Sequence, residues 1–305
     1  MLPVLFSIGN LSISSFGLLL VVAFLFGVFL TFRLARAWDL DEEKILDLTL
    51  LTFLGGLIGS RVYFGLEHPD EFWFHPIRLI LIHKFPGFSF WGAFLGGWLS
   101  LYFFSRRKKM DFWQVGDLAS VGFLGSLIFA DIGCFLGGCS MGIVSDFLAV
   151  PMVGAIGKRF PVQFMEAILF ILALKLIWYQ ATHFHFRGKI VIMSLIYIGF
   201  IKLLTEPFKA IHSWGLVFSL ILIVLGITIF YKLQSGKRKP MSDIKAATFF
   251  LKDLVVEEQV RKVVIDGLKK YWYNQKVQLV WKFKNFTKIL RRFRVRFSRK
   301  QSKLY

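Results

Sequence analysis

Residues 13–32, ISSFGLLLVVAFLFGVFLTF, form a predominantly apolar run that contains no ionisable side chain. Such a run supplies the roughly 20 residues that an α-helix needs to cross the hydrocarbon core of a bilayer. We therefore expect residues 13–32 to be a transmembrane helix. The preceding residues carry no basic side chain, and the run is long enough to span, so we expect this helix to remain in the mature protein rather than be cleaved as a signal peptide.

Six further runs of similar character follow the first. They lie near 46–66, 88–104, 115–137, 162–180, 189–206 and 213–232. Hydrophobic residues make up 56% of the 305 residues, and the mean hydropathy is +0.61. Because this is too apolar for a soluble chain of this length, the sequence predicts an all-α polytopic membrane protein with about seven transmembrane helices.

Basic residues mark one side of the membrane. They fall in the connections after the first, third and fifth runs and in the segment after the seventh: Arg33 and Arg36; Arg106, Arg107, Lys108 and Lys109; Arg187 and Lys189; then the C-terminal tail. The positive-inside rule makes these segments cytoplasmic. We therefore expect the N-terminus and the loops near 67–87, 138–161 and 207–212 outside, and the C-terminus in the cytoplasm.

The C-terminal tail is a distinct segment, so we divide the chain into a transmembrane domain, 1–235, and a basic cytoplasmic tail, 236–305. Residues 232–305 hold 21 Lys and Arg against 5 Asp and Glu, which is +16 of the chain's net +19. Apolar residues recur at helical spacing among these charges: Phe283, Phe286, Leu290, Phe293 and Phe297. The pattern predicts an amphipathic helix attracted to anionic inner-leaflet lipids. A solvated, unstructured tail is the alternative. Because the tail follows directly after a transmembrane run, lipid is favoured over nucleic acid as its binding partner.

Small and ionisable residues within the runs suggest packing and function. Gly55, Gly56 and Gly59, and again Gly92, Gly96 and Gly97, have the spacing that lets two helix backbones approach closely. Ionisable side chains at membrane depth are costly and therefore mark candidate sites; Arg61, Glu166, Lys202 and Glu206 belong to this group, together with Asp131. Asp131 is either functional or part of a structural ion pair with Arg61 or Lys202.

The stretch DIGCFLGGCSMG, residues 131–142, is dense in glycine. Since Gly137 and Gly138 each cost about 1 kcal/mol relative to alanine in a helix, we expect a broken helix or a re-entrant turn here. Exposed backbone at membrane depth needs protein or a wet cavity around it, so the turn is expected to line a lipid-headgroup cavity with Arg61 and Lys202 nearby. A plain helix-packing glycine cluster is the alternative. The spacing of Cys134 and Cys139 fits neither a disulfide framework nor a CxxC metal site.

Five segments, taken in order, resemble the prolipoprotein diacylglyceryl transferases of bacterial plasma membranes. They are PVLFSIGNLSISSFGLLL (3–20), DEEKILDLTLLTFLGGLIGSRVYFGL (41–66), GFSFWGAFLGG (87–97), IGCFLGGCSMG (132–142) and RFPVQFMEAILF (159–170). The resemblance covers roughly residues 3–230. It implies transfer of a diacylglyceryl group from phosphatidylglycerol to the lipobox cysteine of a prolipoprotein, forming a thioether and releasing glycerol phosphate without a metal or redox cofactor.

The resemblance also assigns candidate site residues. The reaction needs a base for the thiol and cations for the departing phosphate. Arg61, Gly142, Gln163 and Glu166 match the family's pattern. Other positions differ from the family's pattern. Lys202 and Lys209 stand in the region where the family has arginines, and Asp131 also stands where it has an arginine. Phe16 replaces a tyrosine of the family, Trp91 a histidine and Cys134 an asparagine. The candidate catalytic residues are Glu166 and Asp131, and the candidate substrate-binding residues are Arg61, Trp91, Gly142, Gln163, Lys202 and Lys209.

Two functional hypotheses follow. One is a divergent but active transferase located in the bacterial plasma membrane. The other is a catalytically inactive paralogue that keeps the fold and binds lipid or a lipoprotein precursor. A transporter or channel is disfavoured because no inverted repeat is apparent and the ionisable residues do not string into a proton path.

Overall fold

The computed structural model describes residues 4–8, 11–72, 76–80, 87–146, 148–152, 157–210 and 214–234, together with scattered positions between 242 and 285. The chain divides into two compact units, Met1–Leu233 and Gln234–Tyr305. The five apolar tail positions between Phe283 and Phe297 lie outside the described residues, so the amphipathic tail helix stays a prediction.

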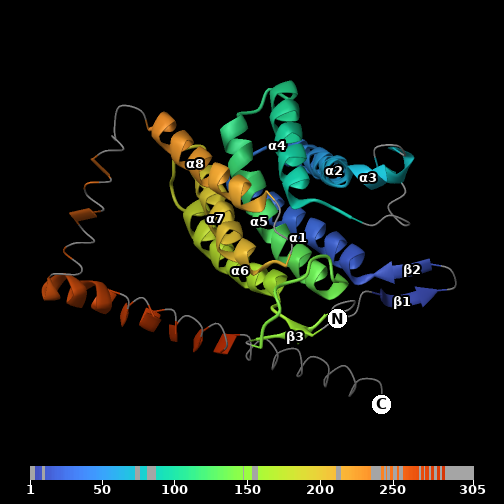
Figure 1. Cartoon of the computed structure of the whole chain (residues 1–305). Coiled ribbons are helices and arrows are strands. Elements are labelled where there is room, and N and C mark those ends of the chain that lie inside the picture. Colours follow the sequence, from blue (N-terminus) through green and yellow to red (C-terminus); the bar gives the residue numbers. More distant parts are fainter. Residues whose placement is uncertain are drawn as a thin grey trace, which may run out of the picture. The chain divides into compact units, whose positions relative to one another are not determined.

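Each of the seven predicted runs is a long helix in the first unit (Figure 1). The helices are α1 (Ser15–Ala37), α2 (Glu42–Glu67), α4 (Phe90–Arg107), α5 (Phe112–Gly137), α6 (Val162–Ala181), α7 (Lys189–Thr205) and α8 (Gly215–Leu233). Three short elements join them: α3 (Pro69–Phe72), η1 (Pro76–Leu79) and η2 (Glu206–Phe208). The prediction of an all-α polytopic fold is confirmed.

Six helices of the described part are long and apolar enough to cross a membrane, and α4 falls outside this set. Its 18 residues include Arg106 and Arg107 in the last turn, which lowers its apolar character. These arginines, like Arg36 in the last turn of α1, lie at a helix C-terminus, where a positive charge interacts favourably with the helix dipole.

Helices α2 and α4 pack against each other through the glycines whose spacing was predicted to allow a close approach. A Cβ added at Gly59 would lie 2.5 Å from the carbonyl oxygen of Gly92 and 2.7 Å from Cα of Gly96. A Cβ at Gly96 would in turn collide with the carbonyl oxygen of Gly55. The two backbones therefore approach each other as closely as small residues allow.

Helix α5 is the centre of the first unit, in contact with α1, α4, α6 and α7 (Figure 1). Its buried Asp117 accepts hydrogen bonds from the backbone N–H groups of Gly188 (2.7 Å) and Val191 (2.8 Å). Because Gly188 provides no side-chain cap for α7, Asp117 satisfies the free N–H groups at the start of that helix. Asp117 is a buried acid that the sequence analysis did not single out.

Two short two-stranded sheets complete the unit. Strands β1 (Val4–Ile8) and β2 (Leu11–Ser14) form an antiparallel hairpin before α1. Strands β3 (Val150–Pro151) and β4 (Lys158–Arg159) pair within the loop between α5 and α6. Neither sheet is predicted by the sequence, because strand pairs this short form through contacts rather than through a periodic pattern.

Candidate functional site

The glycine-rich turn ends α5 as expected. Helix α5 stops at Gly137, and Gly138 adopts the left-handed conformation at φ 73°, which a glycine reaches without steric cost. The chain thereby reverses, and the N–H of Cys139 donates to the carbonyl of Cys134 at 3.0 Å. The prediction of a broken helix is confirmed.

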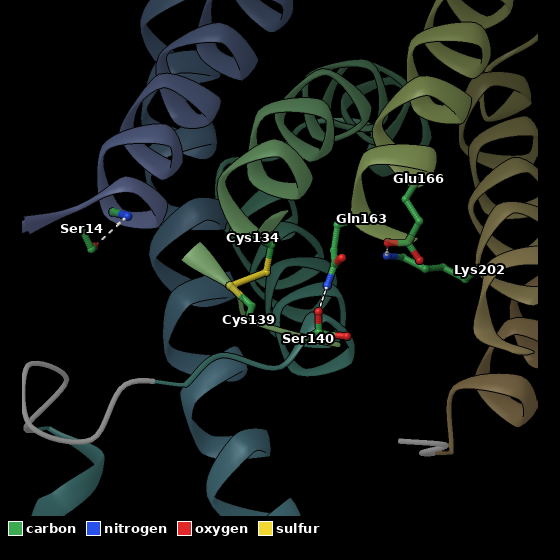
Figure 2. The surroundings of a disulfide bond; sticks show 8 residues. Ser14, Cys134, Cys139, Ser140, Gln163, Glu166 and Lys202 are labelled. Carbon is green, nitrogen blue, oxygen red and sulfur yellow. Dashed lines mark hydrogen bonds and ion pairs between the residues drawn. A yellow bond between two sulfur atoms is a disulfide. The ribbon is translucent and has the colours of Figure 1, made fainter. Parts of the chain in front are cut away.

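Cys134 and Cys139 are joined by a disulfide across this turn (Figure 2). The expectation that their spacing does not fit a disulfide was wrong. A spacing of five residues separates two cysteines along a continuous helix, but here the left-handed Gly138 folds the chain back and leaves their Cα atoms 5.0 Å apart, a normal separation for a disulfide.

The residues after the turn are tied to α6 and to the end of α7. Gln163 donates from Nε2 to the carbonyl of Ser140 at 2.5 Å (Figure 2). The carbonyl of Met141 accepts from the N–H of Ala210 at 2.9 Å. Gly142 forms a β-bridge with Lys209, and its carbonyl accepts from Nη1 of Arg159 at 3.1 Å. A Cβ at Gly142 would collide with the carbonyl of Phe160, so this position requires glycine.

A network of buried charges lies beside these residues, which we call the polar cluster: Glu166, Lys202, Thr205, Glu206 and Lys209. Glu166 accepts from Nζ of Lys202 at 2.6 Å and from the hydroxyl of Thr205 at 2.7 Å. Nζ of Lys209 lies 3.7 Å from Glu166 and 2.6 Å from Glu206. The cluster unites four residues singled out from the sequence, Glu166, Lys202, Glu206 and Lys209.

Helix periodicity places these side chains together. Gln163 and Glu166 are three residues apart on α6 and therefore project from the same face, toward Ser140 and Lys202 respectively (Figure 2). Lys202 and Thr205 have the same spacing on α7. The ammonium of Lys202 also lies 4.4 Å from the ring centroid of Phe90, a cation–π contact that partly offsets the loss of water.

Asp131 is buried near this cluster and has one carboxylate oxygen without a partner. Its Oδ2 makes no hydrogen bond in the described structure, and 9% of the residue is exposed. Asp131 interacts electrostatically with Lys202, Glu166 and Lys209, but Lys202 forms its close ion pair with Glu166. A buried polar atom without a partner is costly, so Asp131 is available to a ligand.

A cavity of about 320 Å³ between the helices reaches Asp131. Most of its wall is apolar, and α1, α2, α4, α5 and α7 contribute to it. Asp131 and Cys134 lie in the wall, as do two further buried hydroxyls without partners among the described residues, those of Thr52 and Ser194. The expectation of a headgroup cavity lined by the glycine turn was wrong: this cavity is largely apolar, and neither the described residues 135–142 nor Arg61 nor Lys202 belongs to its wall.

Arg61 and Trp91 have other neighbours. The guanidinium of Arg61 donates to the backbone carbonyls of Arg78, Leu79 and Gly87 at 2.8 to 3.0 Å, which holds the segment before α4 against α2. Trp91 is buried and stacks on Phe218 with ring centroids 5.2 Å apart. The proposed ion pair between Asp131 and Arg61 is not formed. A direct role of Arg61 or Trp91 in substrate binding stays a prediction.

Arg159 and Thr205 are residues at this site that were not predicted from the sequence. Arg159 contacts Gly142 through Nη1, and its Nε is buried without a hydrogen-bond partner. The signal for Arg159 was present, because this residue begins the segment RFPVQFMEAILF that also contains Gln163 and Glu166. Within the described residues, no group of three or more His, Cys, Asp or Glu side chains is arranged to hold a metal ion.

Comparison with known proteins gives a consistent result. Residues 3–232 match the family model described as prolipoprotein diacylglyceryl transferase. A protein of Idiomarina loihiensis named phosphatidylglycerol–prolipoprotein diacylglyceryl transferase is 30% identical over 74% of this chain and 91% of its own length. A protein of the same name from Clostridium tetani is 26% identical over 75% of this chain and 97% of its own length. Another from Trichormus variabilis is 35% identical over 39% of this chain and 42% of its own length.

Proposed function

The chain belongs to the prolipoprotein diacylglyceryl transferase family, and from this premise we propose how its residues serve the transfer of a diacylglyceryl group from phosphatidylglycerol to a prolipoprotein cysteine. In this reaction a carbon–sulfur bond forms between the thiol and the diacylglyceryl carbon. The bond from that carbon to the phosphate oxygen breaks, and glycerol phosphate leaves. The protein must bind acyl chains, accept the thiol proton and stabilise the leaving phosphate.

The observation that carries the proposal is the apolar cavity that ends at Asp131, next to the polar cluster. Its volume of about 320 Å³ lies within the range of small-molecule sites, and its apolar wall between helices suits an acyl chain. The partnerless hydroxyls of Thr52 and Ser194 and the free oxygen of Asp131 are the polar groups that a lipid entering from the membrane would meet.

Cations for the leaving phosphate are available where the glycine turn meets α7. Lys209 is the most exposed of the charged side chains in the polar cluster, at 21%, and Arg159 adjoins Gly142 with an unused N–H. We assign the phosphate to these two residues. Lys202 is engaged with Glu166 and Phe90, and its role is to keep the Glu166 carboxylate in place.

Asp131 is our candidate for the group that accepts the thiol proton. The thiolate, rather than the thiol, is the nucleophile, and a base must lie within reach of the sulfur. Asp131 has a free oxygen in the cavity wall, whereas both oxygens of Glu166 are occupied by Lys202 and Thr205. Gln163 positions the turn through Ser140, and Gly142 allows the close approach of Phe160.

The location follows from the same premise. The family and the apolar helices place the chain as a multi-pass protein in a bacterial inner membrane. We propose an external N-terminus and a cytoplasmic, basic tail that contacts anionic lipids. A green fluorescent protein fused after Tyr305 should fluoresce in cells, while alkaline phosphatase at the same place should be inactive; the reverse result would refute this orientation.

The function itself is tested by replacement. A bacterium in which this gene replaces the sole diacylglyceryl transferase should grow, and mass spectrometry should find the diacylglyceryl thioether on a lipoprotein cysteine. Growth failure and unmodified lipoprotein, with the chain shown to be inserted in the membrane, would instead support the inactive paralogue.

A further inference from the structure

The disulfide joins an exposed loop residue to the wall of the cavity. Cys139 is exposed, while Cys134 is partly buried and lines the cavity. In Figure 2 the Gln163–Ser140 hydrogen bond lies next to the disulfide, between it and the Glu166–Lys202 pair. The bond therefore lies at the place where, under the proposed function, a peptide must present a cysteine thiol.

We propose that the Cys134–Cys139 disulfide is a thiol-exchange site, which takes the cysteine of a prolipoprotein peptide as a mixed disulfide on Cys139. This inference rests on the proposed function for the identity of the thiol. It adds a covalent peptide-binding step that the transfer reaction itself does not require.

The exchange balances without any further reactant. The peptide thiolate attacks Sγ of Cys139, a new sulfur–sulfur bond forms between peptide and Cys139, and the bond to Cys134 breaks. Cys134 leaves as a thiolate and takes up the proton that the peptide thiol released. The reverse attack by Cys134 restores the internal disulfide and frees the peptide thiol for transfer.

The position of the two sulfur atoms sets the direction of attack. Access decides which sulfur of a disulfide reacts, and Cys139 is the exposed partner. Cys134 is three residues after Asp131, so both residues lie on the same side of α5 and both line the cavity. The released Cys134 thiol therefore faces the cavity, and the captured peptide stays on the loop side.

The turn also connects the exchange to the polar cluster. Ser140, Met141 and Gly142 follow Cys139 directly and are bound to Gln163, Ala210 and Lys209. A peptide held on Cys139 is therefore fixed within a few residues of Lys209, the cation that we assign to the phosphate.

The test uses the full chain in nanodiscs, purified without reductant, and a synthetic lipobox peptide with one cysteine. After incubation and rapid alkylation, mass spectrometry should find a peptide adduct on Cys139, reversed by dithiothreitol, and the alkyl group on Cys134. The adduct should form with or without phosphatidylglycerol. The thioether product needs phosphatidylglycerol and resists dithiothreitol, so failure of the exchange and failure of the transfer are read separately.

Three controls define the site. The peptide with serine in place of cysteine should give neither adduct nor Cys134 label. The Cys134→Ser and Cys139→Ser variants should lose the adduct, because neither can form the internal disulfide. A scrambled peptide with the same cysteine should react less than the lipobox peptide.

The proposal fails if the wild-type chain gives no reducible adduct, or if the peptide is found on Cys134. It fails equally if the scrambled peptide reacts as well as the lipobox peptide, or if the isolated chain carries two free thiols. These decisive measurements all use the wild-type chain, so they hold even where a variant fails to fold.

Discussion

At the scale of single residues, the charges of the polar cluster are bound in pairs, whereas the neighbouring Asp131 has one carboxylate oxygen without a hydrogen-bond partner. Glu166 has partners for both oxygens, and Lys202 lies between Glu166 and the ring of Phe90. Breaking a buried pair leaves an uncompensated charge. Asp131 has no such pair to lose, so substitutions at Lys202 and at Asp131 should act on different properties of the protein.

Lys202→Met is expected to lower the free energy of unfolding by about 3–5 kcal/mol, because the buried Glu166 loses its close ion-pair partner. The double variant with Glu166→Leu should recover most of this stability, since neither charge of the Glu166–Lys202 pair remains. Thermal unfolding in detergent measures the change in stability. Neither variant is expected to transfer lipid, so an assay for the thioether product should find none. A double variant as unstable as the single one would contradict the pairing.

Asp131→Asn is expected to abolish transfer with little change in stability, because the replaced oxygen has no hydrogen-bond partner. The matched comparison is Asp117→Ala, which removes the cap of α7 and should cost about 1–2 kcal/mol. Its remaining folded fraction should still transfer. Wild-type rates in the Asp131→Asn variant would rule out Asp131 as the base.

At the scale of secondary-structure elements, the contact between α2 and α4 depends on the position of each glycine. Gly96 faces the α2 backbone so closely that an added Cβ would collide with Gly55. The adjacent Gly97 has more room: a Cβ there would lie 3.7 Å from the carbonyl of Thr52, an ordinary van der Waals distance. Two neighbouring glycines are thus not equivalent.

Gly96→Ala should therefore separate the two helices and lower the free energy of unfolding by about 1–3 kcal/mol. Gly97→Ala is the matched control and should be neutral or slightly stabilising, since alanine is the better helix former. Unfolding of both purified variants in detergent gives the comparison. Equal losses would mean that the α2–α4 packing is not as close as described.

At the scale of the whole molecule, the family match ends at residue 232, where the first compact unit also ends, at Leu233. The tail beyond it carries most of the net positive charge. All residues that we assign to lipid, thiol and phosphate belong to the first unit. The tail is therefore expected to contribute to membrane attachment rather than to chemistry.

A chain that ends at Gln234 should insert and support thioether formation when it replaces the host transferase. The isolated tail, 236–305, should bind vesicles that contain phosphatidylglycerol and release them at high salt, because basic residues gain about 1 kcal/mol each near an anionic surface. Vesicles of phosphatidylcholine alone are the control. Loss of transfer in a truncated chain that is shown to be inserted would place part of the active machinery in the tail.

The sequence by itself determined the seven helices, the break at Gly137 and Gly138, and the glycine spacing that permits close helix packing. These features follow from composition and from periods of a few residues, which are local properties of the chain. The short sheets, the Cys134–Cys139 bond and the partners of Glu166 and Arg61 were decided by tertiary structure. Each of these contacts joins residues that are brought together by the way turns and helices fold back on one another. The spacing of the residues along the chain does not determine how far apart they lie in the folded protein.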